Sequence, residues 1–169
     1  AWLLKAGAGV SQTDINGNTA LHQAVLSGNL QLLEKLLPLA KNLDPANNNG
    51  STPLLLAAET GRVVIIKRLL EAGADFNRKD ARGNTILHIL SAKPGQGREI
   101  IAANLASRFR DVNIRNFDDY TPLHLAARVG NLAVISALIK AGARIDARLP
   151  DGSTALFFCK PVITSNLLG

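Results

Sequence analysis

The sequence predicts an all-α solenoid in which short helix–turn–helix units stack along one axis. The main observation is a Thr-x-Leu motif that begins five times, at Thr19, Thr52, Thr85, Thr121 and Thr154. The steps between successive threonines are 33, 33, 36 and 33 residues, and a fixed period of this length is typical of repeat proteins. Two features recur in phase. A glycine precedes the threonine by two residues in every copy except the fourth, which has Asp119, and an apolar pair such as Leu69-Leu70 closes each full copy.

The elements of one unit follow from local chemistry, and the fourth copy is the clearest. The turn before Thr121 is polar, the threonine hydroxyl is suited to cap a helix, and Pro122 fits the first helical turn, where no hydrogen-bond donor is lost. Gly130 ends this first helix, and a second apolar helix follows until Gly142. Because one such pair cannot bury its apolar face alone, we expect roughly nine helices of about 7–11 residues, no extended sheet, and contacts between adjacent units only.

The repeat register divides the single predicted domain into unequal pieces. Residues 1–13 read as the end of a truncated repeat, and residues 149–169 as a partial or capping repeat in which Pro161 interrupts the first helix. The full repeats are residues 14–46, 47–79, 80–115 and 116–148. The third is three residues longer, and the extra length falls in Ser91–Gly97. Since this segment contains a proline and two glycines, it is expected to be a surface loop that adds nothing to the core.

The run from Tyr120 to Leu132 resembles the signature of the ankyrin repeat family, and Leu138-Ile139-Lys140-Ala141-Gly142-Ala143 follows it in phase. The resemblance implies paired antiparallel helices with β-hairpin-like fingers, which bind other proteins through the fingers and inner helices, and it implies no shared catalytic activity. It also implies two possible hydroxylation sites, because some members of the family are hydroxylated on a finger asparagine. These are Asn77 and Asn113, each with a leucine eight residues upstream.

Several kinds of chemistry are disfavoured by the sequence. His22, His88 and His124 all follow their motif threonine by three residues, so they lie a repeat or more apart and are expected to bond neighbouring turns instead of one metal ion. Cys159 is the only cysteine, and we expect it to be a small packed thiol. A single cysteine excludes an intrachain disulfide and favours a reducing intracellular location, in the cytoplasm or nucleus. No cofactor or metal is predicted, and no apolar run approaches the roughly 20 residues of a membrane helix.

The basic charge belongs to one segment of the chain. Residues 61–115 carry eleven Lys and Arg against five acidic residues, whereas residues 1–60 carry three against four. Aromatic residues beside arginines are typical of binding hot spots, and this composition occurs near the third and fourth turns. The predicted partner-binding residues are Lys79, Arg82, Asn84, Arg115, Phe117, Asp118, Tyr120, Arg128 and Arg148. The alternative is that Phe117 packs on a neighbouring finger and that the basic side chains are only solvated.

The sequence therefore predicts a monomeric, non-enzymatic protein-interaction module whose partner presents an acidic protein surface. One alternative is that the chain is the targeting or substrate-recruiting domain of a larger enzyme or effector whose catalytic part lies elsewhere. Nucleic-acid binding is less favoured despite a sequence pI of about 9.9, because the arginines accompany neither a groove-reading helix nor a stacking sheet.

Overall fold

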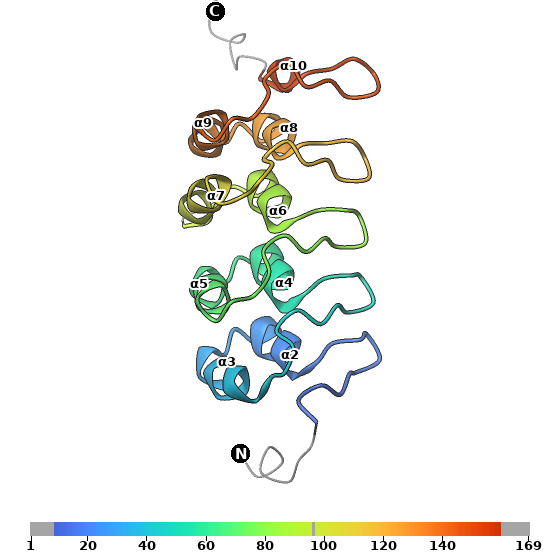
Figure 1. Ribbon diagram of the computed structural model, residues 1–169, viewed down its shortest axis with the longest axis vertical. Helices are drawn as coiled ribbons and strands as arrows, with labels where there is room; N and C mark the ends of the chain where they lie inside the picture. The colour runs from blue at the N-terminus through green and yellow to red at the C-terminus, as the bar shows by residue number, and fades with distance from the viewer. Residues whose placement is uncertain (1–8, 96, 160–169) are drawn as a thin grey trace, which may run out of the picture.

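Helices stand in two columns along the long axis of this computed structural model, which describes residues 9–95 and 97–159 (Figure 1). The inner column, next to the projecting turns, contains α2 (Ala20–Leu26), α4 (Pro53–Thr60), α6 (Ile86–Ala92), α8 (Pro122–Arg128) and α10 (Ala155–Phe158). The outer column contains α3 (Leu30–Leu36), α5 (Val63–Glu71), α7 (Arg98–Ala106) and α9 (Leu132–Lys140), and a short 3-10 helix, η1 (Leu37–Leu39), follows α3. We call the successive inner–outer pairs units 1 to 4, and α10 represents unit 5.

The predicted helix count and the absence of a sheet are confirmed for the described residues. Nine α-helices are present, and all but the four-residue α10 have seven to nine residues. The only β-type pairing in this part of the chain is an isolated bridge between Arg148 and Thr154. Each inner helix packs on its own outer helix and on the inner helix of the next unit, as expected for a solenoid. None of the described helices has the length and apolarity needed to cross a bilayer.

The core is aliphatic and continuous along the stack. Leu21, Leu54, Leu87 and Leu123 occupy the same motif position in successive units, and each is at most 3% exposed. The motif threonines begin the inner helices as predicted. The Thr52 hydroxyl, for example, accepts the Leu55 backbone N–H at 3.3 Å, which satisfies one of the donors that a helix N-terminus leaves free.

The three histidines connect neighbouring units, as the sequence predicts. In His88 the Nδ1 atom accepts the Thr85 backbone N–H at 3.2 Å, and Nε2 lies 3.1 Å from the Tyr120 carbonyl of the next unit. His22 makes the equivalent bonds, with Nε2 at the Ser51 carbonyl. His124 bonds Thr121 in the same way, but its Nε2 lies 3.0 Å from the Ala147 carbonyl, just before finger 5. A carbonyl partner at Nε2 and an N–H partner at Nδ1 select the neutral ring with its proton on Nε2.

The turns before the inner helices form five fingers that project to one side of the stack (Figure 1). They comprise residues 14–18, 47–51, 80–84, 116–120 and 149–153, numbered fingers 1 to 5. One backbone hydrogen bond joins each of the first three fingers to the next: Asn48 N–H to Asn16 O, Ala81 N–H to Asn49 O, and Phe117 N–H to Arg82 O. The ladder ends at finger 5 because the equivalent residue there is Pro150, which has no N–H.

The junction between units 2 and 3 lacks three hydrogen bonds that both neighbouring junctions have. These are the histidine bond, a bond between finger asparagines, and a bond from a side chain after the outer helix to the next unit's backbone. Across units 1 and 2 they join His22 to Ser51, Asn47 to Asn18, and Asp75 to Asp44. Across units 3 and 4 they join His88 to Tyr120, Asn116 to Asn84, and Arg144 to Asn113.

Sequence differences explain the loss. Leu55 replaces the histidine, and Asp80 stands where Asn47 and Asn116 stand in the other units, so it has no amide to donate. The third bond is missing because the Asn77 amide turns back to Asp75 of its own turn at 3.1 Å. The finger ladder and a 3.2 Å bond from Lys93 Nζ to the Glu59 carbonyl remain across this junction.

The structure corrects two expectations. Ser91 is fully buried and Ala92 is helical, so both belong to α6, and the loop expected over Ser91–Gly97 begins only at Lys93. Cys159, expected to be packed, is a free and exposed thiol because it follows the last described turn of the stack. The expectations for the opening repeat tail at residues 1–8 and for Pro161 lie outside the described residues.

We predict that acid destabilises the fold between about pH 6.5 and pH 4. Burial lowers the pKa of His88 from 6.5 to about 4, and burial also lowers the pKa values of His22 and His124. The unfolded chain therefore binds protons that the native chain excludes, so stability is complete above pH 6.5 and decreases through this window. For His88 alone the shift corresponds to about 3 kcal/mol.

The measurement is the urea midpoint as a function of pH. His88→Leu is the matched variant, since Leu55 already occupies this position in unit 2. It should be less stable than the parent at pH 7, by about 1–3 kcal/mol for the lost hydrogen bonds, yet depend less on pH below 6.5. An equally steep acid loss in the variant would contradict the assignment to His88.

We also predict that the unit 2–unit 3 junction opens more readily than the next one. Ala81 N–H and Phe117 N–H make equivalent ladder bonds of 3.0 and 2.9 Å, but only Phe117 lies at a junction with the additional hydrogen bonds. Native-state hydrogen exchange should therefore show weaker protection at Ala81 than at Phe117. Equal protection would mean that apolar packing around Leu55 replaces the missing bonds.

Candidate functional site

A hollow of about 300 Å³ lies where fingers 3 and 4 meet the inner helices, and we call it the inner-face pocket. Side chains of fingers 3 and 4 form its wall, and residues of α4, α6 and α8 form its floor. Ile89 and Leu125 give the floor its apolar surface, since both are less than 10% exposed but still reach the pocket. The lining residues are Glu59, Asp80, Arg82, Asn84, His88, Ile89, Ala92, Lys93, Asn116, Asp118, Tyr120, Leu125 and Arg128.

The carboxylates of the pocket are mostly used to hold the protein's own turns. Asp80 accepts the backbone N–H groups of Arg82 and Asn84, both at 2.8 Å, together with the Asn84 amide. Glu59 accepts the Ser51 hydroxyl at 3.3 Å. The Arg82 guanidinium, in contrast, is exposed and makes no ion pair within the described part of the chain. Asp118 is exposed and its carboxylate bonds no described residue. Because Arg128 is exposed as well, the pocket presents two guanidinium groups against this one carboxylate.

Tyr120 is half-buried at the pocket wall. Its ring centroid lies 6.3 Å from the Phe158 ring and 6.2 Å from the His124 ring, and the Arg128 guanidinium lies 5.5 Å from its centroid. From the sequence, Tyr120 was expected to lie outside the core. No sequence pattern indicated that α10 would place Phe158 against its ring. The Tyr120 ring therefore contributes to stacking of units 4 and 5 as well as to the pocket surface.

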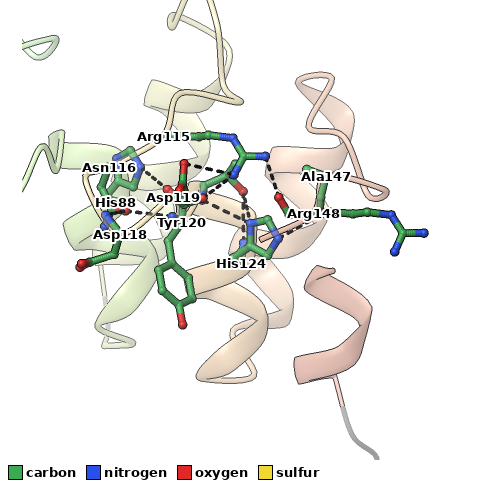
Figure 2. Close-up of polar contacts among 10 residues, drawn as sticks. His88, Arg115, Asn116, Asp118, Asp119, Tyr120, His124, Ala147 and Arg148 are labelled. Carbon is green, nitrogen blue, oxygen red and sulfur yellow. Dashed lines mark hydrogen bonds and ion pairs between the residues drawn. The ribbon is translucent and has the colours of Figure 1, made fainter. Parts of the chain in front are cut away.

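Arg115 and Arg148, predicted to flank the same turn as a basic rim, lie away from the inner-face pocket. Arg115 donates from Nη1 to the Asp119 carbonyl and from Nη2 to the Arg148 carbonyl, both at 2.8 Å, and so joins fingers 4 and 5 where the backbone ladder has ended (Figure 2). In the same view, the side chains of Asp118 and Tyr120 point away from this cluster. The two arginines instead line a separate hollow of about 400 Å³ with Asn113, Thr121, Arg144, Asp146 and Ala147.

The remaining predicted partner-binding residues also do not all lie at one site. Arg82, Asn84, Asp118, Tyr120 and Arg128 meet at the inner-face pocket. Phe117 is 74% exposed at the tip of finger 4, where its ring lies against the backbone of Gly83, and it lines neither hollow. Lys79 is exposed and also lies outside both.

Sequence reasoning missed several residues of the pocket, among them Glu59, Ile89, Lys93 and Leu125. The signal for two of them was present, since Ile89 and Leu125 follow their motif threonine by four residues and therefore face the same side of their helices. Among the described residues no group of three or more His, Cys, Asp or Glu side chains is placed to hold a metal ion. The site thus offers polar, charged and aromatic recognition groups.

The two asparagines considered for hydroxylation differ in accessibility. Asn77 is exposed, and its amide bonds only Asp75 in its own turn. Asn113 is half-buried and bridges two units, because its Oδ1 accepts the Arg144 N–H at 2.7 Å and its amide donates to the Gly142 carbonyl at 3.3 Å.

Asp119 occupies the glycine position of finger 4 with φ +63° and is the only residue other than glycine with a positive φ in the described chain. A Cβ at the equivalent Gly50 or Gly83 would lie within 3.0 Å of the next finger, at Ala81 or Phe117. Fingers 4 and 5 lack the ladder bond that draws the other fingers together, so a side chain fits here. The Asp119 carboxylate uses this space to lie 3.7 Å from Arg115.

A family model described as ankyrin repeats in three copies matches residues 1–80 and 65–151, which together cover most of the chain. The chain belongs to the ankyrin repeat family. The NF-kappa-B p105 subunit of Gallus gallus is 32% identical over 145 residues, which cover 83% of this chain. Neurogenic locus notch homolog protein 1 of Xenopus laevis is 38% identical over 152 residues, or 90% of this chain, and the B-cell lymphoma 3 protein homolog of Mus musculus is 30% identical over 142 residues, or 81%.

This ankyrin repeat chain spans only a small part of those relatives: 14% of the p105 subunit, 5% of the notch homolog and 32% of the B-cell lymphoma 3 homolog. The shared part is the repeat stack itself. Family membership therefore supports a protein–protein interaction module, and the functions of the longer relatives do not transfer with it.

We predict that Asp119→Gly stabilises the domain. A residue with a Cβ is disfavoured at this φ, by less for Asp than for most residues, and the exposed ion pair with Arg115 contributes little. The gain should be about 0.5 kcal/mol in the free energy of urea unfolding, because glycine also makes the unfolded chain more flexible.

The reverse change at finger 3, Gly83→Asp, is the matched control. There the new Cβ meets the Phe117 ring and backbone, so this variant should be clearly less stable than the parent. A loss of stability in Asp119→Gly would show that the carboxylate contact with Arg115 outweighs the backbone strain.

Proposed function

We propose that this ankyrin repeat chain recruits a partner protein by binding an acidic part of its surface at the inner-face pocket. The observation that carries the proposal is the difference in engagement of the charged groups. Asp80 and Glu59 already accept hydrogen bonds from the protein, and Asp118 is the one carboxylate of the pocket lining that bonds no described residue. Among the described residues Arg82 has no ion-pair partner, and Arg128 lies over the Tyr120 ring. Two available guanidinium groups beside an aromatic ring favour carboxylates on a partner.

The neighbouring charge supports the same choice of partner. Residues 61–115 carry six more basic than acidic side chains, and such a field speeds the approach of an acidic surface. A rigid stack presents the site without ordering a segment first, which avoids one cost of association. We propose that the chain acts as a monomer in this role and inside the cell, consistent with its single cysteine.

A role as the targeting part of a larger enzyme or effector rests on the same surface. Such a chain would use the inner-face pocket to hold a substrate or an assembly partner, and the chemistry would belong to another domain. Recruitment is the common element of both proposals, and the binding experiment below tests it in either setting.

Hydroxylation is a separate proposal, and the structure favours Asn77 over Asn113 as the modified residue. The Asn77 side chain would have to break one local hydrogen bond to be modified, whereas the Asn113 side chain bonds the next unit and so holds two units together. Burial of the upstream residues Leu69 and Leu105, at 0% and 1% exposure, is the same for both sites.

We predict that Arg82→Glu slows association with the partner isolated by affinity capture. Reversing an exposed charge at the rim acts mainly on long-range attraction, so the association rate should fall by about 3- to 10-fold at low salt and by less at high salt. The measurement is surface plasmon resonance at two salt concentrations.

Lys140→Glu on the outer helix α9 is the charge-matched control, because Lys140 is exposed on the opposite column. It changes the net charge equally and should leave association nearly unchanged. Equal effects of the two variants would show that net charge alone, and not the inner-face pocket, attracts the partner.

A further inference from the structure

A second hollow lies on the same face as the inner-face pocket, at fingers 1 and 2, and we call it the amide pocket. It has a volume of about 260 Å³. Its lining contains no charged side chain and consists of Asn16, Asn18, Leu26, Asn47, Asn48, Asn49 and Leu56. Leu56 holds the same helix position as Ile89 and Leu125 in the inner-face pocket, four residues after the motif threonine. The two pockets therefore lie against the same side of the inner helices, whose fingers follow one another along the stack (Figure 1).

The groups along this surface change character at the junction between units 2 and 3. The position three residues before the motif threonine is Asn16 in finger 1, Asn49 in finger 2 and Arg82 in finger 3. The side-chain amides of Asn16 and Asn49 are exposed and bond no described residue. Each of these amides offers an NH2 group as donor and a carbonyl oxygen as acceptor, whereas the Arg82 guanidinium offers N–H donors and a positive charge but no acceptor.

A free side-chain amide is complementary to the main chain of an extended segment. In such a segment every residue presents an N–H and a C=O, whereas a helix uses these groups internally. Spacing agrees with this reading. Packed helices lie about 8–10 Å apart. An extended chain in the polyproline II conformation advances about 3.1 Å per residue with three residues per turn, so every third residue of the segment faces the same side and meets a new unit.

We infer that the inner face binds an extended, acidic segment of the partner, which lies across the fingers from the amide pocket to the inner-face pocket. Asn16 and Asn49 bond its main chain, Arg82 and Arg128 bind its carboxylate, and its apolar side chains contact Leu56, Ile89 and Leu125 at intervals of three residues. This inference rests on the proposed function and specifies the conformation and sequence pattern of the partner.

The bound segment also crosses the junction between units 2 and 3. Because that junction lacks three hydrogen bonds of its neighbours, a ligand held on both sides of it supplies the missing connection. Binding should therefore slow the exchange of the Ala81 N–H, which bonds the Asn49 carbonyl across this junction.

The experiment selects ligands from a random library of displayed peptides of about twelve residues, long enough to reach four units at three residues each. The selected sequences should share an acidic residue and apolar residues three apart. Binding of a selected peptide, followed by fluorescence anisotropy, should weaken about tenfold with Arg82→Gln and severalfold with Asn49→Ala. Lys140→Gln on the outer column is the control and should leave the affinity unchanged.

A backbone-modified peptide isolates the amide contact. Methylating each main-chain nitrogen in turn should find one position at which affinity falls in the parent but not further in Asn49→Ala. Binders whose apolar residues follow the helical spacing i, i+4, i+7 instead of i, i+3, i+6 would overturn the inference. So would binders unaffected by Arg82→Gln and Asn49→Ala, binders that leave Ala81 exchange unchanged, or an empty selection. If the captured partner still responds to Arg82→Glu in any of these cases, the proposed function holds and only the extended binding mode is wrong.

Discussion

No unit of this protein can bury its apolar face without a neighbour, and every other property of the chain depends on that constraint. Two helices of seven to nine residues enclose little volume, so the leucines of each motif become core only when the next unit covers them. The same contact fixes the fingers, because a buried imidazole reaches the carbonyl of the next finger and a backbone ladder joins the tips. The binding surface is thus positioned by the bonds that hold the stack together.

This arrangement decides which charged side chains are left for recognition. Arg115 sits where the ladder has ended, and its guanidinium bonds two carbonyls to join fingers 4 and 5. Arg82 sits in a finger whose backbone is already held by Asp80 and by the ladder, so its side chain has no structural partner. Two arginines of similar sequence setting therefore have different roles, and the difference arises from what the adjacent unit still needs.

The period, the helix caps and the histidine bonds were predictable from the sequence because each depends on residues at fixed spacing within one repeat. Features that depend on two different units were not. Tyr120 is half-buried because Phe158, more than a full repeat away, lies beside its ring. Similarly, Arg115 lies apart from the inner-face pocket because its guanidinium bonds the Asp119 carbonyl and, 33 residues on, the Arg148 carbonyl. A repeat register indicates which side a residue faces, but not which group it meets there.

The sparse junction between units 2 and 3 has a mechanical consequence. A solenoid pulled from its two ends carries the same tension through every junction, and it parts first where the fewest bonds share that load. Among the three junctions that join units 1 to 4, that is the junction between units 2 and 3, which lies beyond the amide pocket and beside Glu59 of the inner-face pocket. A ligand that bridges both pockets would then act as a clamp, and the chain would release it when stretched. Leu55 and Asp80, in the second and third repeats, would in that way make the proposed binding of a partner sensitive to force.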